Sequence, residues 1–81
     1  MSPRDQLIET LQVTVGEVGI IDTAEKGIKV AILNNVIKRL AAGQSKFVIM
    51  KWMNAAHRTL DVDVKHVAQE VYETYLKEKT W

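Results

Sequence analysis

The chain has 81 residues, of which 47% are hydrophobic, and its formal net charge is +1. This length predicts a single small helical domain over residues 1–81, and the hydrophobic content argues against intrinsic disorder. The absence of cysteine excludes disulfides and thiolate metal sites. The first residues lack the apolar stretch of a signal peptide and no apolar run is long enough for a bilayer, so we expect a cytoplasmic protein without membrane contact.

Charged residues are segregated along the chain rather than mixed. Residues 1–25 carry a net charge of −4, residues 26–60 carry +7 without any Asp or Glu, and residues 61–81 carry −2. Such a basic block predicts either a negatively charged partner or acidic segments of the same chain lying over it.

The first two of four predicted helices cover approximately residues 3–18 and 23–42. The helix at 3–18 begins after Ser2, a capping residue, but is the weakest because β-branched residues and glycines crowd its second half. A short extended piece is the alternative at its end. The helix at 23–42 has an apolar stripe at helical spacing and ends before Gly43, a residue type that favours the left-handed conformation after a helix.

The last two predicted helices cover approximately residues 46–59 and 64–79, with Ser45 and Asp63 as the expected N-caps. The helix at 64–79 has the most regular apolar repeat in the chain. The apolar side of the helix at 46–59 is expected to hold Val48, Ile49, Trp52, Met53, Ala56 and Leu60. These patterns predict an all-α fold, a compact bundle of four helices.

A candidate nucleic-acid surface follows from the basic block. Clustered cations suit a phosphate backbone because binding releases condensed counterions, and Arg and Asn can each form paired hydrogen bonds with a base. The candidate residues are Lys38, Arg39, Ser45, Lys46, Lys51, Asn54 and Arg58. Lys26 and Lys29 are candidates to extend this surface. A solvated, charged helix face is the alternative interpretation.

The helices at 23–42 and 46–59 match a helix-turn-helix only in part. With Gly43 at the turn glycine, Lys38 and Gln44 fall at positions that favour apolar residues. Arg39 falls where a small residue packs between the two helices.

A second window, with Asp61 at the glycine position, fits more apolar positions but places Asp61 and Asp63 where they would repel phosphate. The Gly43 window is the better of the two in charge and the poorer in packing. Neither is specific, so the arrangement is only helix-turn-helix-like and no motif is assigned.

A second candidate surface is a helix-packing or dimer face. Ala24, Gly27 and Ala31 lie opposite the apolar stripe of the helix at 23–42, and small residues allow another backbone to come close. Phe47 adds an aromatic side chain that we expect on the outer side of its helix. The alternative is a central helix that packs against neighbours on both sides, and a symmetric homodimer is the sharper interpretation.

Catalytic and metal sites are not predicted. His57, Asp61, Asp63 and His66 are metal-ligating residue types, but their spacing matches no metal motif. The sequence has no Gly-rich phosphate loop and no activated nucleophile. We therefore expect a non-enzymatic regulatory or accessory protein, without cofactor or small-molecule substrate. Its expected partner is nucleic acid, with duplex DNA favoured over RNA, or alternatively another protein, including a second copy of the chain.

Overall fold

The computed structural model describes residues 2–19, 22–77 and 81. Its helices are α1 (Pro3–Val18), α2 (Ala24–Ala41), α3 (Lys46–His57) and α4 (Val62–Val71), and α4 continues into a π-helical turn, η1 (Tyr72–Leu76). No strand occurs among the described residues. The predicted all-α bundle of four helices is confirmed.

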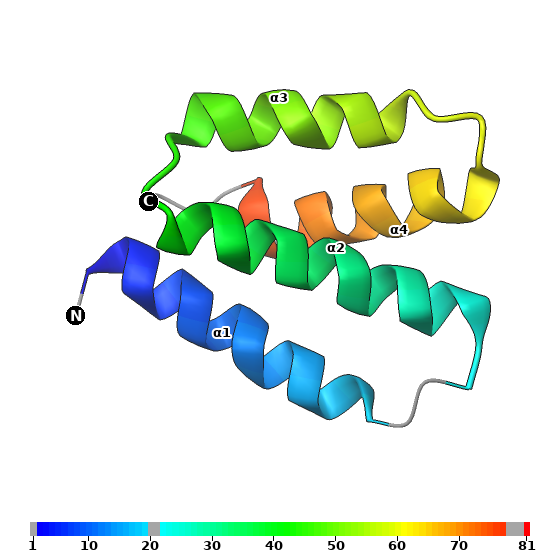
Figure 1. Ribbon diagram of the computed structural model, residues 1–81, viewed down its shortest axis with the longest axis horizontal. Coiled ribbons are helices and arrows are strands. Elements are labelled where there is room, and N and C mark those ends of the chain that lie inside the picture. Colours follow the sequence, from blue (N-terminus) through cyan, green and yellow to red (C-terminus); the bar gives the residue numbers. More distant parts are fainter. Residues whose placement is uncertain (1, 20–21, 78–80) are drawn as a thin grey trace.

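The central helix is α2. It packs against α1 and against α4, and α4 in turn packs against α3. In Figure 1, α1 and α3 lie at opposite edges of the molecule, with α2 and α4 between them. The two middle helices therefore separate the acidic first helix from α3.

The core lies between the helices, and the buried residues that the structure describes are all apolar. They come from every helix, with the largest share from the predicted stripe of α2. The core residues are Leu7, Leu11, Ile32, Leu33, Val36, Leu40, Ile49, Met53, Val67, Ala68, Val71 and Leu76. Burial contributes about 25 cal/mol per Å² of apolar surface, and this term holds the helices together.

Helix starts follow the predicted capping residues. Ser2 Oγ accepts the backbone N–H of Asp5 at 3.1 Å, and Ser45 Oγ accepts that of Val48 at 3.2 Å. Each bond satisfies one of the amide groups that an α-helix leaves without a partner in its first turn. The two predicted caps are confirmed, and Ser45 fixes where α3 begins.

Gly43 ends α2 as predicted. Its φ is 79°, in the left-handed region that favours glycine. The N–H of Gly43 donates to Leu40 O at 3.0 Å and the N–H of Gln44 donates to Arg39 O at 3.1 Å, the bond pair of a Schellman motif. This turn directs the chain from α2 into α3 within a few residues.

The prediction that Asp63 caps the fourth helix was wrong. Asp61 is the N-cap, because its Oδ1 accepts the backbone N–H groups of Asp63 at 3.0 Å and Val64 at 3.2 Å. α4 consequently begins at Val62.

Two residues expected on the apolar side of α3 lie at the surface instead. Leu60 is 99% exposed because α3 ends at His57 and leaves Leu60 in the connection to α4. Val48 is also exposed, at the start of α3. Ile49 and Met53 are fully buried, so the predicted face is confirmed only along its centre.

The end of α4 departs from a regular α-helix. The N–H of Lys77 donates to Tyr72 O at 2.9 Å, an i→i+5 bond that holds one residue more than an α-turn. Leu76, the last residue of η1, is fully buried, whereas Tyr75, expected on the apolar stripe, is half-buried. The expected helix end at 79 and residues 20–21 of the alternative extended piece lie outside the described residues.

Candidate nucleic-acid interface

The cations of residues 26–60 lie in different environments. Lys26 Nζ lies 3.1 Å from Asp22 Oδ1, and Lys29 Nζ lies 3.0 Å from Glu70 Oε1. Carboxylates therefore neutralise both lysines of the first half of α2. These two side chains do not extend an unpaired basic surface.

The Lys29–Glu70 pair also joins two helices. The ammonium group of Lys29 donates a hydrogen bond to Glu70 Oε1, which raises the pKa of Lys29 above its ordinary value of 10.5 although partial burial opposes the rise. Lys29 is therefore charged at neutral pH, and its charge serves the contact between α2 and α4.

Arg39 is held by its own chain. Its Nε donates to Asn35 Oδ1 at 2.8 Å and one terminal nitrogen donates to Gln44 Oε1 at 3.2 Å. The guanidinium lies 4.8 Å from the centre of the Trp52 ring, within cation–π range. Trp52 is half-buried and packs against the core as predicted. Arg39 thus links α2, the turn and α3, and a nucleic acid would have to compete with these contacts.

Lys46 has contacts within the chain as well. Its Nζ lies 5.6 Å from the centre of the Trp81 ring, and the guanidinium of Arg4 lies 5.7 Å from the same ring. Arg4 also donates to Leu40 O at 3.2 Å. Trp81 is half-buried against the core, so it joins the start of α1 to the start of α3.

The remaining side chains of the candidate set are exposed: Lys38, Lys51, Asn54 and Arg58. Within the part of the chain that the structure describes, no ion pair engages Lys38, Lys51 or Arg58. Spacings of three and four residues place Lys51, Asn54 and the C-cap residue Arg58 on one side of α3, opposite the buried Ile49 and Met53. We call these three exposed residues the α3 stripe.

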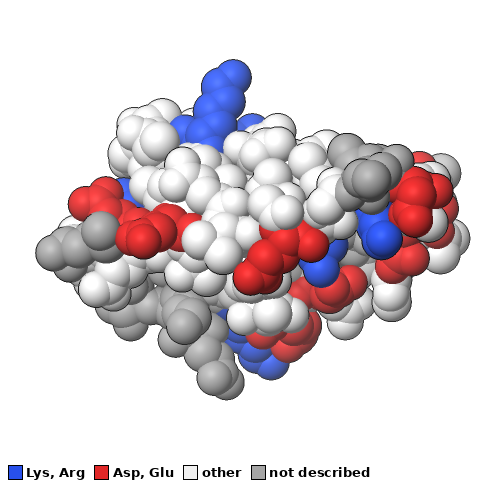
Figure 2. All heavy atoms as spheres, turned by 90° about the horizontal axis from the view of Figure 1, so that it is seen from below, with Lys and Arg blue, Asp and Glu red and all other residues white. Residues whose placement is uncertain are grey.

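The acidic helix α1 does not cover the α3 stripe. Figure 2 views the molecule from the α1 side and shows carboxylates spread over this face, with cations among them. Because α1 and α3 occupy opposite edges of the molecule, these carboxylates lie far from the stripe. The acidic residues of α1 therefore do not lie over the cations of the α3 stripe.

Apolar side chains flank the α3 stripe at both ends. Phe47 lies at its start and is 76% exposed. Leu60 and Val62, which is 75% exposed, follow its end. Ser45, the remaining candidate, uses its oxygen as the N-cap of α3.

The small-residue face of α2 is only partly covered. Ala24 and Ala31 are exposed and Gly27 is half-buried. α2 packs against neighbours on two sides, as the alternative interpretation of this helix expected.

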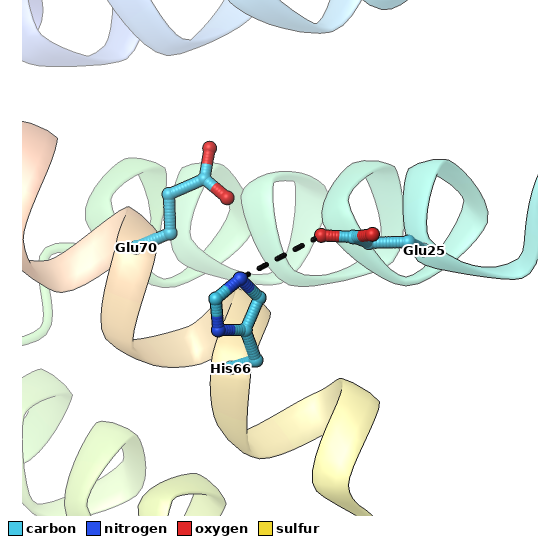
Figure 3. Close-up of side chains that lie close together, drawn as sticks. All are labelled: Glu25, His66 and Glu70. Carbon is cyan, nitrogen blue, oxygen red and sulfur yellow. Dashed lines mark ion pairs between the residues drawn. The ribbon is translucent and has the colours of Figure 1, made fainter.

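The metal-ligating residue types do not gather as a group of His57, Asp61, Asp63 and His66. His57 packs edge-on against Tyr72, with ring centres 5.9 Å apart. His66 lies instead beside Glu25 and Glu70, as Figure 3 shows. Glu25 belongs to another helix. In the sequence, therefore, only the four-residue spacing of His66 and Glu70 could have indicated this group.

No protein-family model, curated protein or solved structure matches the chain. No helix within the described residues combines the length and the apolar character needed to cross a membrane.

Proposed function

We propose that the protein binds nucleic acid, and duplex DNA in particular, through the α3 stripe and Lys38, as a non-enzymatic regulatory or accessory factor. The observation that carries the proposal is the exposure of Lys38, Lys51 and Arg58 without an ion pair in the described part of the chain. Cations that no carboxylate neutralises can replace counterions on a phosphate backbone.

The shape of the stripe suits a groove of duplex DNA. α3 has 12 residues, which gives it a length of about 18 Å, and the major groove of B-DNA admits an α-helix. Asn54 lies between Lys51 and Arg58 in the sequence and is exposed. Asn54 is suited to adenine, whereas Lys51 and Arg58 contact phosphate, as does Lys38.

The proposed contact set is smaller than the one expected from sequence. Arg39 and Lys46 have partners within the chain and serve mainly to position α3, and Ser45 acts as its cap. Lys26 and Lys29 are paired with carboxylates. A cytoplasmic location accompanies the proposal, and a cysteine-free sequence suits a reducing compartment.

A protein-interaction role is the second candidate, because apolar side chains are exposed at both ends of the stripe. Phe47, Leu60 and Val62 are the most exposed large apolar residues that the structure describes. A second copy of the chain could cover them, which would make the protein a homodimer adaptor without nucleic-acid binding.

Gel-shift titration against random duplex DNA tests the proposal, with duplex RNA as competitor. Three phosphate contacts predict a loss of about fortyfold in affinity between about 50 mM and about 200 mM salt. We expect a shift at low salt that weakens by this factor and that RNA competes for poorly. A folded protein that gives no shift at low salt contradicts the proposal, and sedimentation of the same sample tests the homodimer.

A further inference from the structure

Three metal-ligating side chains meet at the contact between α2 and α4. Glu25 comes from the first turn of α2, and His66 and Glu70 come from successive turns of α4. One ligand atom of each lies within 4.8 Å of the others. Figure 3 shows the Glu25 carboxylate and the His66 imidazole directed toward each other, with Glu70 on the same side of α4.

Helix geometry explains why these side chains converge. His66 and Glu70 are four residues apart, which places them on one face of α4, one turn above the other. That face meets α2, and the packing brings Glu25 Oε1 to 3.8 Å from His66 Nε2. The group is therefore formed by the tertiary fold and joins two helices.

The three ligand atoms, which lie within 4.8 Å of one another, must move closer together to form a tetrahedral metal site. With metal–ligand bonds of about 2.1 Å, neighbouring ligand atoms around zinc lie about 3.4 Å apart. The His66–Glu25 separation of 3.8 Å exceeds this by a few tenths of an ångström. Both side chains are more than half exposed, so their rotamers are free to adjust.

The chemistry of the ligands selects the kind of ion. An imidazole with two carboxylates suits Zn²⁺ and similar transition metals, whereas Mg²⁺ and Ca²⁺ prefer a shell of oxygens. Three protein ligands leave a fourth position for water, as in open zinc sites. We propose that Glu25, His66 and Glu70 bind one divalent ion of the zinc type, which fastens the first turn of α2 to α4.

Lys29 orients one of the ligands. Its hydrogen bond to Glu70 Oε1 at 3.0 Å holds that carboxylate toward α2, so we expect the second oxygen to bind the ion. Outer contacts of this kind commonly fix ligating carboxylates. The positive charge of Lys29 also reduces the attraction for a cation, so we expect weaker binding than in closed four-ligand zinc sites.

Calorimetric titration of the full chain with zinc chloride tests this inference. We expect one Zn²⁺ per chain and a melting temperature that rises with zinc concentration, because an ion that binds only the folded state stabilises it. The H66A variant should bind at least about tenfold more weakly, since loss of outer contacts alone costs about 10–100-fold in metal affinity. The E25Q variant should also bind more weakly.

Two matched controls separate the site from non-specific attraction. E9Q removes a carboxylate on α1, and H57A removes the only other histidine in the chain, so zinc binding should persist in both. Mg²⁺ should not compete. The inference is overturned if the wild-type chain takes up no zinc saturably, if H66A binds zinc as the wild type does, or if Mg²⁺ displaces it. None of these outcomes depends on nucleic-acid binding.

Discussion

Residues 26–60 contain no Asp or Glu, and the cations in the first half of this segment differ in their partners from those in its second half. In the first half of α2, Lys26 and Lys29 form ion pairs with Asp22 and Glu70, and Lys29 joins α2 to α4. On α3, Lys51 and Arg58 point away from the core and no ion pair of the described residues engages them. Segregation of charge along a sequence therefore does not fix segregation on the surface, because packing decides which cations meet carboxylates.

The largest expected effect concerns Trp52, a residue of α3 whose ring contacts Arg39 of α2. The W52A variant should lose about 3 kcal/mol of unfolding free energy, because a large half-buried side chain and its cation–π contact are removed. Urea unfolding measures the loss. W52F is the matched control and should lose less than about 1.5 kcal/mol. If W52A kept its stability but lost DNA binding, Trp52 would belong to the interface rather than to the core.

The second prediction compares the halves directly, with two double variants of equal net charge. K51Q/R58Q should make the slope of log affinity against log salt concentration shallower by about 1.8, the equivalent of two phosphate contacts. The reason is that each exposed cation is proposed to replace counterions. K26Q/K29Q should leave that slope unchanged. Gel-shift titrations over a series of salt concentrations provide the slopes. Equal slopes for the two variants would show that net charge alone governs binding.

The third prediction concerns Lys29. K29M should lose about 0.5 kcal/mol at neutral pH, a value discounted because the Lys29 and Glu70 side chains are 25% and 42% exposed. The folded-state pKa of Lys29 is raised, so the pair stabilises the fold fully below pH 10.5 and loses this effect as the pH rises through the raised pKa.

Urea unfolding of wild type and K29M at neutral and strongly alkaline pH measures this difference. The two proteins should converge in stability at the alkaline end. A difference that persists there would assign the effect of Lys29 to packing of its methylene stem.

The smallest expected effect is that of F47S. Phe47 is largely exposed, so its loss should change stability by less than about 0.5 kcal/mol. Sedimentation of wild type and F47S distinguishes the two candidate functions. A wild-type dimer that becomes a monomer in F47S would favour the adaptor, whereas monomers in both cases favour the α3 stripe as a DNA contact.

Features set by local chemistry were predictable from the sequence. Ser2, Ser45 and Gly43 mark helix ends through hydrogen bonds or backbone conformations that involve only a few neighbouring residues. The apolar stripe of α2 was also predictable, because the period of a helix decides which side chains share a face.

Features set by tertiary packing were not predictable. Asp61 and Asp63 are both suitable caps two residues apart, and the choice depends on where α3 ends and how the chain returns. The pairing of Lys29 with Glu70 and the meeting of Glu25 with His66 require the α2–α4 contact. The sequence therefore predicted which face of α3 forms the candidate nucleic-acid surface. It did not predict how many cations of the candidate set remain without an ion pair.

The π-helical turn at the end of α4 has a consequence for length variation. The turn holds one extra residue, and Leu76 reaches the core five positions after Val71, where a regular helix would place it off the buried side. Deletion of Thr74 would convert this turn into an α-turn and return Leu76 to the position four after Val71. A one-residue deletion inside α2 would rotate half of its core stripe into solvent, so the turn at the end of α4 absorbs a lost residue more easily than the middle of α2 does.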